Sequence, residues 1–299
     1  MNYQELGRIL LPEESPLLGP YQANSVMRQR RIVLRETLIR IDSEDERLRL
    51  RKQALRNVAF WLDQSRKTQI HKAGRGVDGQ AKVQVIQGDW GDVTQKLTQK
   101  HGQVFAVLNM ANAFTAGGGY VEGMSAQEEN MFRRTDCHFY VGCNEFDRQN
   151  DRYTSDMTAL VNAQEGRVYL DSESVRVCLR GSEDCSRDDL GYDWISEDQI
   201  FPFYELKSAA LDLRTFEYNK EEMTRRIVAQ LDTLIEHKIR HVILGAFGCG
   251  AFRNPASEVA GIYQKEINDR CENFDVVAFA IHTSGGGPDN FSYFDLFFG

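Results

Sequence analysis

Five short apolar runs, separated by segments with helical periodicity, constrain the fold of this chain more than any other feature. Several of the runs are nearly continuous and do not alternate with polar residues, as is typical of strands that are covered on both faces. They lie at residues 82–87, 104–110, 206–213, 241–247 and 274–281. Helical patterns lie between them, at residues 127–136, 219–237 and 255–270. Alternating strands and helices predict an α/β fold with a layered sheet.

Three regions stand outside this alternation. Residues 24–66 predict helices, with a cap at Asn24 or Ser25 and one apolar stripe formed by Leu48, Leu55, Val58 and Leu62. Residues 71–80 contain three glycines and predict a loop. Residues 139–202 are polar and acidic, so we expect an insertion that lies over the sheet, with a hairpin formed by 168–170 and 175–179.

The predicted organisation therefore has two parts. An N-terminal helical extension, residues 1–75, packs on an α/β domain of residues 76–299, which carries the insertion at about 139–202. A solvated surface decoration and a functional element are equally good interpretations of that insertion.

Charge and hydropathy limit what the chain can bind. Acidic residues outnumber basic ones by 44 to 36, a net charge of −8, which argues against a broad basic groove for nucleic acid or anionic membrane. No apolar stretch is long enough for a membrane span, and the start, MNYQELGRIL, lacks the signal-peptide pattern. We therefore expect a cytoplasmic protein without a membrane partner, in which any anionic ligand is held locally.

Cysteine usage does not indicate a disulfide framework or a metal centre. The six cysteines include no C-x-x-C pair. Cys137, His138 and Cys143 lie close together, but zinc sites normally contain two paired ligand sets and only one is present. We expect neither a metal nor another cofactor.

Two glycine loops each follow a predicted strand directly, which is where open α/β sheets bind ligands. Glycine lets backbone N–H groups approach a ligand closely, so such loops can hold a diphosphate without lysine. Each loop taken alone is also compatible with a simple tight turn, and neither has the spacing of a P-loop or of the dinucleotide fingerprint. The loop residues expected to contact the ligand are Gly117, Gly118, Gly119, Gly248, Cys249, Gly250, Ala251 and Phe252.

Gln127, Glu128 and Glu129 begin a predicted helix shortly after the first glycine loop. Acidic residues in a first helical turn often do no more than interact with the helix dipole. These carboxyl groups, however, follow closely on a proposed diphosphate loop, so they could reach a sugar attached to that diphosphate. We therefore treat all three residues as candidates for the site.

Polar residues at strand ends complete the candidate site. Asn109 and Asn112 end the strand before the first glycine loop and could bind sugar hydroxyls. Their alternative role is in a turn or cap, which we expect more for Asn109 than for Asn112. Asp89 ends the first strand, where it either accepts from an exocyclic amine such as that of adenine or caps the following helix.

Taken together, these motifs resemble those of the microbial-type poly(ADP-ribose) glycohydrolases. Gly117–Gly119, seven intervening residues and Gln-Glu-Glu match that family's signature, in which this triplet follows three glycines after a gap of six to eight residues. The segment LGAFGCGAFRNP, residues 244–255, is similar to the family's second phosphate loop, and the arginine-rich N-terminal helix with Glu36-Thr37 is also similar. The resemblance implies a macrodomain-like, three-layer α/β/α fold with a mixed central sheet, an N-terminal helical extension, and ADP-ribose lying across the strand ends.

The resemblance also implies a role for each residue in hydrolysis of an ADP-ribosyl bond. Glu129 is the catalytic acid and Glu128 its sugar-binding neighbour, while Asn112 and Phe252 contact the distal ribose. The two glycine loops hold the diphosphate. Consecutive helical residues point about 100° apart and cannot flank one bond from opposite faces. One carboxyl group must therefore act chemically while the other orients the sugar.

Two alternatives remain open beside hydrolysis of poly(ADP-ribose). A non-catalytic reader of ADP-ribose would use the same loops, although it does not need Glu128 and Glu129. A hydrolase of single ADP-ribosyl groups on protein or nucleic acid would share the chemistry and could use the insertion at 139–202 to recognise the carrier.

Overall fold

The structure is a computed structural model that describes residues 25–70, 82–142, 145–147, 150, 152–283 and 289–299. The predicted loop at 71–80, the possible cap Asn24 and the candidate ligand Cys143 lie outside the described residues. The boundary expected at residue 75 stays a prediction for the same reason.

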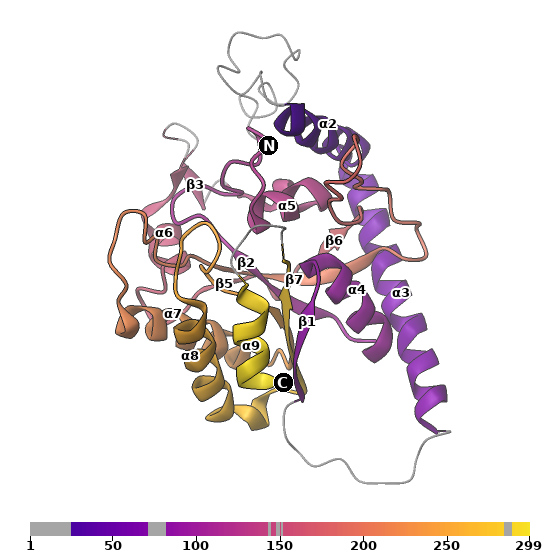
Figure 1. Ribbon diagram of the computed structural model, residues 1–299. Coiled ribbons are helices and arrows are strands. Elements are labelled where there is room, and N and C mark those ends of the chain that lie inside the picture. Colours follow the sequence, from indigo (N-terminus) through magenta and orange to yellow (C-terminus); the bar gives the residue numbers. More distant parts are fainter. Residues whose placement is uncertain (1–24, 71–81, 143–144, 148–149, 151, 284–288) are drawn as a thin grey trace.

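A mixed central sheet organises the described part of the chain (Figure 1). Its strands follow the order β1-β9-β8-β2-β7-β5, and β6 also pairs with β7. All neighbours are parallel except β5 and β6, which run antiparallel to β7. The strand bounds are β1 Lys82–Gln87, β2 Phe105–Met110, β5 Tyr169–Leu170, β6 Arg176–Cys178, β7 Phe201–Ser208, β8 His241–Leu244 and β9 Val276–Ile281. The mixed α/β fold expected from the sequence is confirmed.

Helices cover both faces of the sheet. The α-helices of the described part are α2 Ser25–Arg40, α3 Glu44–Ile70, α4 Trp90–His101, α5 Gln127–Arg134, α6 Ser155–Val161, α7 Lys220–Glu236, α8 Ala256–Asn268 and α9 Asn290–Phe298. Two 3-10 turns, η2 Cys137–Tyr140 and η3 Cys271–Asn273, and a small hairpin of β3 Phe146–Asp147 with β4 Arg152–Tyr153 complete it. In Figure 1, α7, α8 and α9 lie on one side of the sheet, and α3 and α4 lie on the other.

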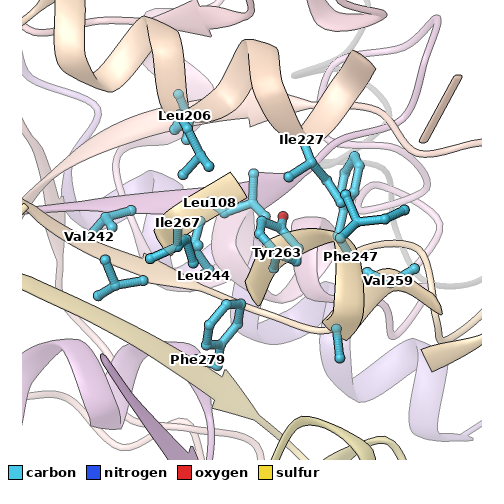
Figure 2. Packing of buried hydrophobic residues seen from close by; sticks show 14 of the residues in the cluster. Leu108, Leu206, Ile227, Val242, Leu244, Phe247, Val259, Tyr263, Ile267 and Phe279 are labelled. Carbon is cyan, nitrogen blue, oxygen red and sulfur yellow. The ribbon is translucent and has the colours of Figure 1, made fainter. Parts of the chain in front are cut away.

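Alternate residues of each central strand supply two separate cores. Leu108 of β2 packs with Ile227 of α7 and Tyr263 of α8 in the core shown in Figure 2. Val107, the neighbouring residue of β2, faces the opposite core together with Trp90 of α4 and Met131 of α5. The helix α5 therefore belongs to the face of the sheet that carries the odd-numbered residues of β2.

The insertion differs in part from the expectation, because two of its segments, β5 and β6, widen the sheet at the edge of β7. The predicted hairpin is wrong: the strands β5 and β6 pair with β7 and not with each other. Leu170 lies opposite Leu206, and Arg176 lies opposite Phe203. An eight-residue β7 is long enough to pair with two short strands in succession along one edge. Residues of the insertion thus become part of the core.

The predicted stripe on the second N-terminal helix is also partly wrong. Leu48 and Leu55 are exposed, whereas the buried apolar positions of α3 are Leu50, Ala54, Val58 and Trp61. These positions follow one another at helical spacing and face the sheet. Leu34 and Leu38 of α2 share a core with α4 and α5, so the extension has no core separate from the α/β domain in the described part of the chain.

Helix α2 holds the segment between the first glycine loop and α5. Gly123 has a φ of +86°, and a Cβ there would lie 2.3 Å from the Met27 carbonyl oxygen. Arg30 Nη1 donates to the Gly123 carbonyl at 3.3 Å, and Arg133 Nη1 donates to the Met124 carbonyl at 2.6 Å. The backbone of this segment is therefore pressed directly against α2.

Replacing Gly123 by alanine tests that contact. Gly166 is a matched control, because its φ is +71° but no atom lies within 4 Å of the position that an added Cβ would take. We expect Gly166→Ala to cost about 1 kcal/mol of unfolding free energy through backbone strain alone. Gly123→Ala should cost about 2 kcal/mol more, since the helix or the loop has to move. Chemical denaturation measures both; equal costs would contradict close packing of the segment on α2.

Candidate active site

The side chain of Gln127 attaches the start of α5 to the carboxyl end of β2. Its Oε1 accepts from the Met110 N–H at 2.9 Å, and its Nε2 donates to the Leu108 carbonyl at 2.9 Å. The side-chain amide thus bonds to one N–H and one carbonyl of β2, as the backbone of a neighbouring strand would. The structure therefore gives Gln127 a positioning task in place of the ligand contact expected from the sequence.

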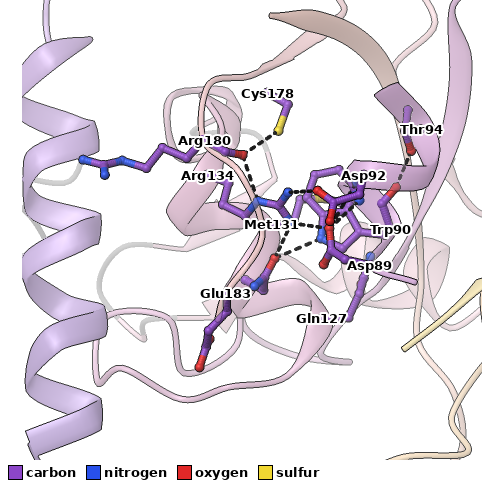
Figure 3. A network of polar contacts seen from close by, with 12 residues as sticks. Asp89, Trp90, Asp92, Thr94, Gln127, Met131, Arg134, Cys178, Arg180 and Glu183 are labelled. Carbon is purple, nitrogen blue, oxygen red and sulfur yellow. Dashed lines mark hydrogen bonds and ion pairs between the residues drawn. The ribbon is translucent and has the colours of Figure 1, made fainter. Parts of the chain in front are cut away.

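The other end of α5 is held by a buried arginine (Figure 3). Arg134 Nη1 donates to Asp89 Oδ1 at 2.6 Å and to Asn130 Oδ1 at 2.9 Å, and Arg134 Nε donates to the Arg180 carbonyl at 3.0 Å. Asp89 Oδ1 also accepts from the Gly91 N–H at 2.8 Å, so Asp89 caps α4, the alternative role considered from the sequence. Only Asp89 Oδ2 is left for contact with an adenine amine.

Glu128 and Glu129 both reach back to the first glycine loop, but to different depths. Glu128 is buried: its Oε1 accepts from the Gly117 N–H at 3.0 Å and its Oε2 from the Asn112 N–H at 2.7 Å. Glu129 is half-buried, and its Oε1 accepts from the Gly119 N–H at 3.0 Å. A Cβ on Gly118, whose φ is +54°, would lie 2.4 Å from Glu129 Oε1. The glycine between the two contacts thus leaves room for the carboxylate.

These contacts change the interpretation of the first glycine loop. The N–H groups of Gly117 and Gly119 point at carboxylates, and that of Gly118 donates to the Thr115 carbonyl at 3.2 Å. A buried carboxylate needs donors of this kind, because leaving it unpaired would be costly. The loop therefore holds the two glutamates, and the N–H groups of its three glycines are not free to hold a diphosphate as expected.

The second glycine loop is built differently. Its Gly248 carbonyl accepts from the Asn254 N–H at 3.0 Å. Four of its backbone N–H groups have no hydrogen-bond partner in the described part of the chain. They are those of Gly248, Gly250, Ala251 and Phe252. Free backbone donors in a glycine loop suit an anion such as a diphosphate. The structure thus leaves this role to the second loop.

Cys249 and Phe252 occupy different surroundings within that loop. Cys249 is buried, its N–H donates to the Ala246 carbonyl at 3.0 Å, and burial raises the pKa of its thiol to about 12. Neither its side chain nor its N–H is placed for the expected ligand contact. Phe252 is half-buried, and the Arg214 guanidinium lies 5.1 Å from its ring centre. Its ring is therefore partly accessible at the edge of the loop.

The turn role considered for the two asparagines falls on Asn112 and not on Asn109. Asn112 Oδ1 accepts from the N–H groups of Phe114 at 2.9 Å and Thr115 at 3.0 Å, which makes Asn112 the turn residue. Its Nδ2 has no partner in the described ranges and could still donate to a sugar hydroxyl. Asn109 is fully buried, and its Nδ2 donates to Glu205 Oε1 at 2.8 Å. The expectation that the turn role falls on Asn109 is wrong.

Sequence reasoning missed three charged residues beneath α5. Glu205, Lys207 and Arg176 are fully buried on β7 and β6. The apolar run was predicted to begin at residue 206, yet β7 begins at Phe201. Two charges at alternate positions of a strand-like segment were the available signal, since charged residues are almost never fully buried unless they are paired.

The surroundings of Glu128 act on its ionisation in opposite directions. Burial and the neighbouring charge of Glu129 raise the pKa of Glu128 well above its ordinary value. The N–H groups of Asn112 and Gly117 and the charge of Lys207 act to lower that pKa. Such a carboxyl group is a reasonable candidate for a functional role.

The described ranges contain neither a cluster of metal-binding side chains nor a membrane-spanning helix. They contain no group of three or more His, Cys, Asp or Glu side chains arranged to hold a metal ion. None of the helices in those ranges has the length and apolar character needed to cross a bilayer.

The raised pKa of Glu128 has a consequence for stability. The folded state binds this proton more tightly than the unfolded chain, so the group stabilises fully below its ordinary pKa of 4.5, and that stabilisation is lost as pH rises through the folded pKa. We therefore expect the unfolding free energy of the wild type, minus that of Glu128→Gln, to fall as pH rises above 4.5.

Glu222→Gln on α7 is the control for this measurement. Burial acts to raise the pKa of Glu222, but pairing with Arg225 and Arg226 outweighs it and lowers the pKa. The unfolding free energy of the wild type, minus that of Glu222→Gln, should then rise with pH below 4.5. Denaturant titrations across acidic and neutral pH provide both slopes. A Glu128→Gln difference that stays constant with pH would contradict the assigned environment.

Residues 30–171 match the family model for the catalytic domain of microbial-type PARG, the poly(ADP-ribose) glycohydrolases. A search of curated proteins finds no significant match.

Solved structures similar to this chain are bacterial poly(ADP-ribose) glycohydrolases. The enzyme from Thermomonospora curvata is 21% identical with a TM-score of 0.60, covering 91% of this chain and 100% of that one. Its complex with the inhibitor ADP-HPD is 22% identical with a TM-score of 0.55, covering 90% and 99%. The enzyme from Deinococcus radiodurans with ADP-ribose is 18% identical with a TM-score of 0.54, covering 85% and 91%. The fold is shared, and the match at 30–171 confirms the resemblance to the microbial-type poly(ADP-ribose) glycohydrolases.

Proposed function

We propose that this chain is a glycohydrolase that cleaves ADP-ribosyl bonds, above all the ribose–ribose bonds of poly(ADP-ribose), and releases ADP-ribose. The observation that carries the proposal is the pair of adjacent carboxylates held on one glycine loop at different depths. A protein that only binds ADP-ribose has no need of a buried glutamate beside a second, accessible one. The similar structures that contain ADP-ribose or ADP-HPD support the same class of ligand.

The free donors of the site define how the substrate lies. The unpaired N–H groups of the second glycine loop, including those of Gly250 and Ala251, hold the diphosphate. Asn112 Nδ2 and the ring of Phe252 contact the distal ribose. Asp89 Oδ2, at the end of β1, accepts from the adenine amine. The ligand thus follows the carboxyl ends of the parallel strands, with its distal ribose at the two glutamates.

Glu129 carries the chemistry in this proposal. The Gly119 N–H holds its Oε1, which leaves Oε2 to give a proton to the leaving oxygen as the anomeric bond breaks. The transition state has oxocarbenium character, and water then adds to the anomeric carbon. The ionised Glu129 takes a proton from that water, which restores the acid. One carboxyl group acts as acid and then as base.

Glu128 orients the sugar and the loop. Both of its oxygens already accept from backbone N–H groups at 2.7 and 3.0 Å. Each carboxylate oxygen has a further lone pair, so Glu128 can also accept from a ribose hydroxyl. A residue held this tightly is suited to fixing geometry and less suited to delivering a proton.

Matched substitutions of the two glutamates test the proposal. Glu129→Gln keeps the size and hydrogen-bonding capacity of the side chain but cannot deliver a proton, so release of ADP-ribose from poly(ADP-ribose) should fall by about 10²- to 10⁴-fold with ADP-ribose binding retained. Glu128→Gln should lose less turnover and more affinity. Chromatographic product analysis and calorimetry distinguish the two effects.

The same assay separates the alternatives. Near wild-type turnover by a folded Glu129→Gln variant would contradict the role assigned to Glu129. Wild-type protein that binds ADP-ribose but cleaves neither the polymer nor singly modified protein would be a reader. Wild-type protein that cleaves only singly modified protein would be a hydrolase of single ADP-ribosyl groups.

A further inference from the structure

The part of the insertion between β6 and β7 folds back on itself at residues 181–193, which we call the insertion turn. The Gly181 N–H donates to the Asp193 carbonyl at 2.8 Å, and the Tyr192 N–H donates to the Ser182 carbonyl at 3.2 Å. Tyr192 has a φ of +56°, which is uncommon for a residue with a Cβ, and its side chain is fully buried. Contacts with the rest of the structure have to hold such a backbone in place.

The hydroxyl of Tyr192 joins the insertion turn to α5. It accepts from Asn130 Nδ2 at 3.2 Å and from Arg133 Nε at 3.2 Å. It donates to Glu183 Oε2. Burial raises the pKa of Tyr192 to about 12, so near neutral pH the hydroxyl keeps the proton that it donates. One oxygen atom thus binds two residues of the helix that begins with the two glutamates.

Two arginines extend these contacts to the segment that precedes α5. Arg133 Nη1 donates to the Met124 carbonyl at 2.6 Å, and Arg30 Nη1 donates to the Gly123 carbonyl at 3.3 Å. Arg30 Nη2 also donates to Glu183 Oε1 at 2.6 Å. Both guanidinium groups are therefore held from the insertion turn while they bind two successive carbonyl groups of the segment.

Met124 in turn contacts the loop that holds Glu129. The Met124 N–H donates to the Gly119 carbonyl at 3.0 Å, and the Gly119 N–H donates to Glu129 Oε1 at 3.0 Å. A Cβ on Gly119 would lie 2.6 Å from Met124 Cγ, so the two residues are also closely packed. Hydrogen bonds thus connect the Tyr192 hydroxyl with the Glu129 carboxylate, one residue at a time.

We propose that Tyr192 is a positioning residue for Glu129: its hydroxyl holds the segment after the first glycine loop where Gly119 can bind the Glu129 carboxylate. The insertion then has a functional part and is more than a surface decoration. A displacement of about 1 Å in a reacting group can cost about 100-fold in rate, so a contact remote from the substrate affects turnover. The effect on turnover rests on the proposed function, whereas the effect on the loop does not.

Hydrogen exchange in the ligand-free full chain tests the effect on the loop. Tyr192→Phe removes the hydroxyl and keeps the ring. Tyr263→Phe is the matched control, because Tyr263 is also fully buried and its hydroxyl donates to Gln230 Oε1 at 2.6 Å, in the core on the opposite face of the sheet. Both variants lose a buried hydrogen bond and should lose similar global stability. Only Tyr192→Phe should speed exchange of the Gly119 and Met124 N–H groups beyond that, by about 10-fold.

Turnover is the second readout. Tyr192→Phe should lower kcat on poly(ADP-ribose) by about 10-fold, while the dissociation constant for ADP-ribose stays close to that of the wild type. Tyr263→Phe should leave both values unchanged. A merely structural role for Tyr192 would not separate turnover from ADP-ribose binding in this way.

Equal exchange rates at Gly119 and Met124 in the two variants would overturn the proposal, because the hydroxyl would then contribute only general stability. Faster exchange with an unchanged kcat in an active protein would overturn it as well. If Tyr192→Phe does not fold, Arg30→Met decides, since it removes the second contact between the insertion turn and the segment. It should also speed exchange of the Met124 N–H, and an unchanged rate would contradict the proposal.

Failure of the proposed function gives a different result. If the wild type cleaves no ADP-ribosyl bond, but Tyr192→Phe still loosens the loop and Tyr263→Phe does not, the hold of the insertion turn on Glu129 stands and the proposed function is removed.

Discussion

The carboxylate of Glu128, held by the N–H groups of Asn112 and Gly117, is the interaction on which the rest of the site depends. It joins the end of β2, the first glycine loop and the start of α5 at one buried point. Gln127 fastens the same helix to β2, and Arg134 fastens its far end to Asp89. The geometry at Glu129 is therefore determined by the sheet.

This arrangement lowers the stability of the fold and in return fixes the position of the two glutamates. Removing a carboxylate from water costs several kcal/mol, and hydrogen bonds to it recover only part of that cost. A second glutamate beside it increases the penalty. A fold selected only for stability would replace Glu128 by an apolar side chain. Buried charges such as Lys207 and Glu205 near the same point fit a site maintained for function.

The sequence was sufficient for the elements with strong periodicity and for the motif positions, but not for the direction of polar groups. The bounds of β1 agree with the prediction, and α5 begins at Gln127 as expected. The start of β7 was missed because Glu205 interrupts the apolar run just before residue 206, although its side chain is buried. The amide of Gly117 could not be assigned, because its direction depends on loop backbone angles and on the carboxylate that it meets.

A crystal structure with ADP-ribose bound tests the central claim most directly. The account predicts that the diphosphate lies within hydrogen-bond distance of N–H groups in the second glycine loop, such as that of Gly250. It also predicts that Glu128 keeps its bonds to Asn112 and Gly117. A diphosphate bound instead by the amides of Gly117 and Gly119, with both glutamates displaced from the loop, would contradict the account.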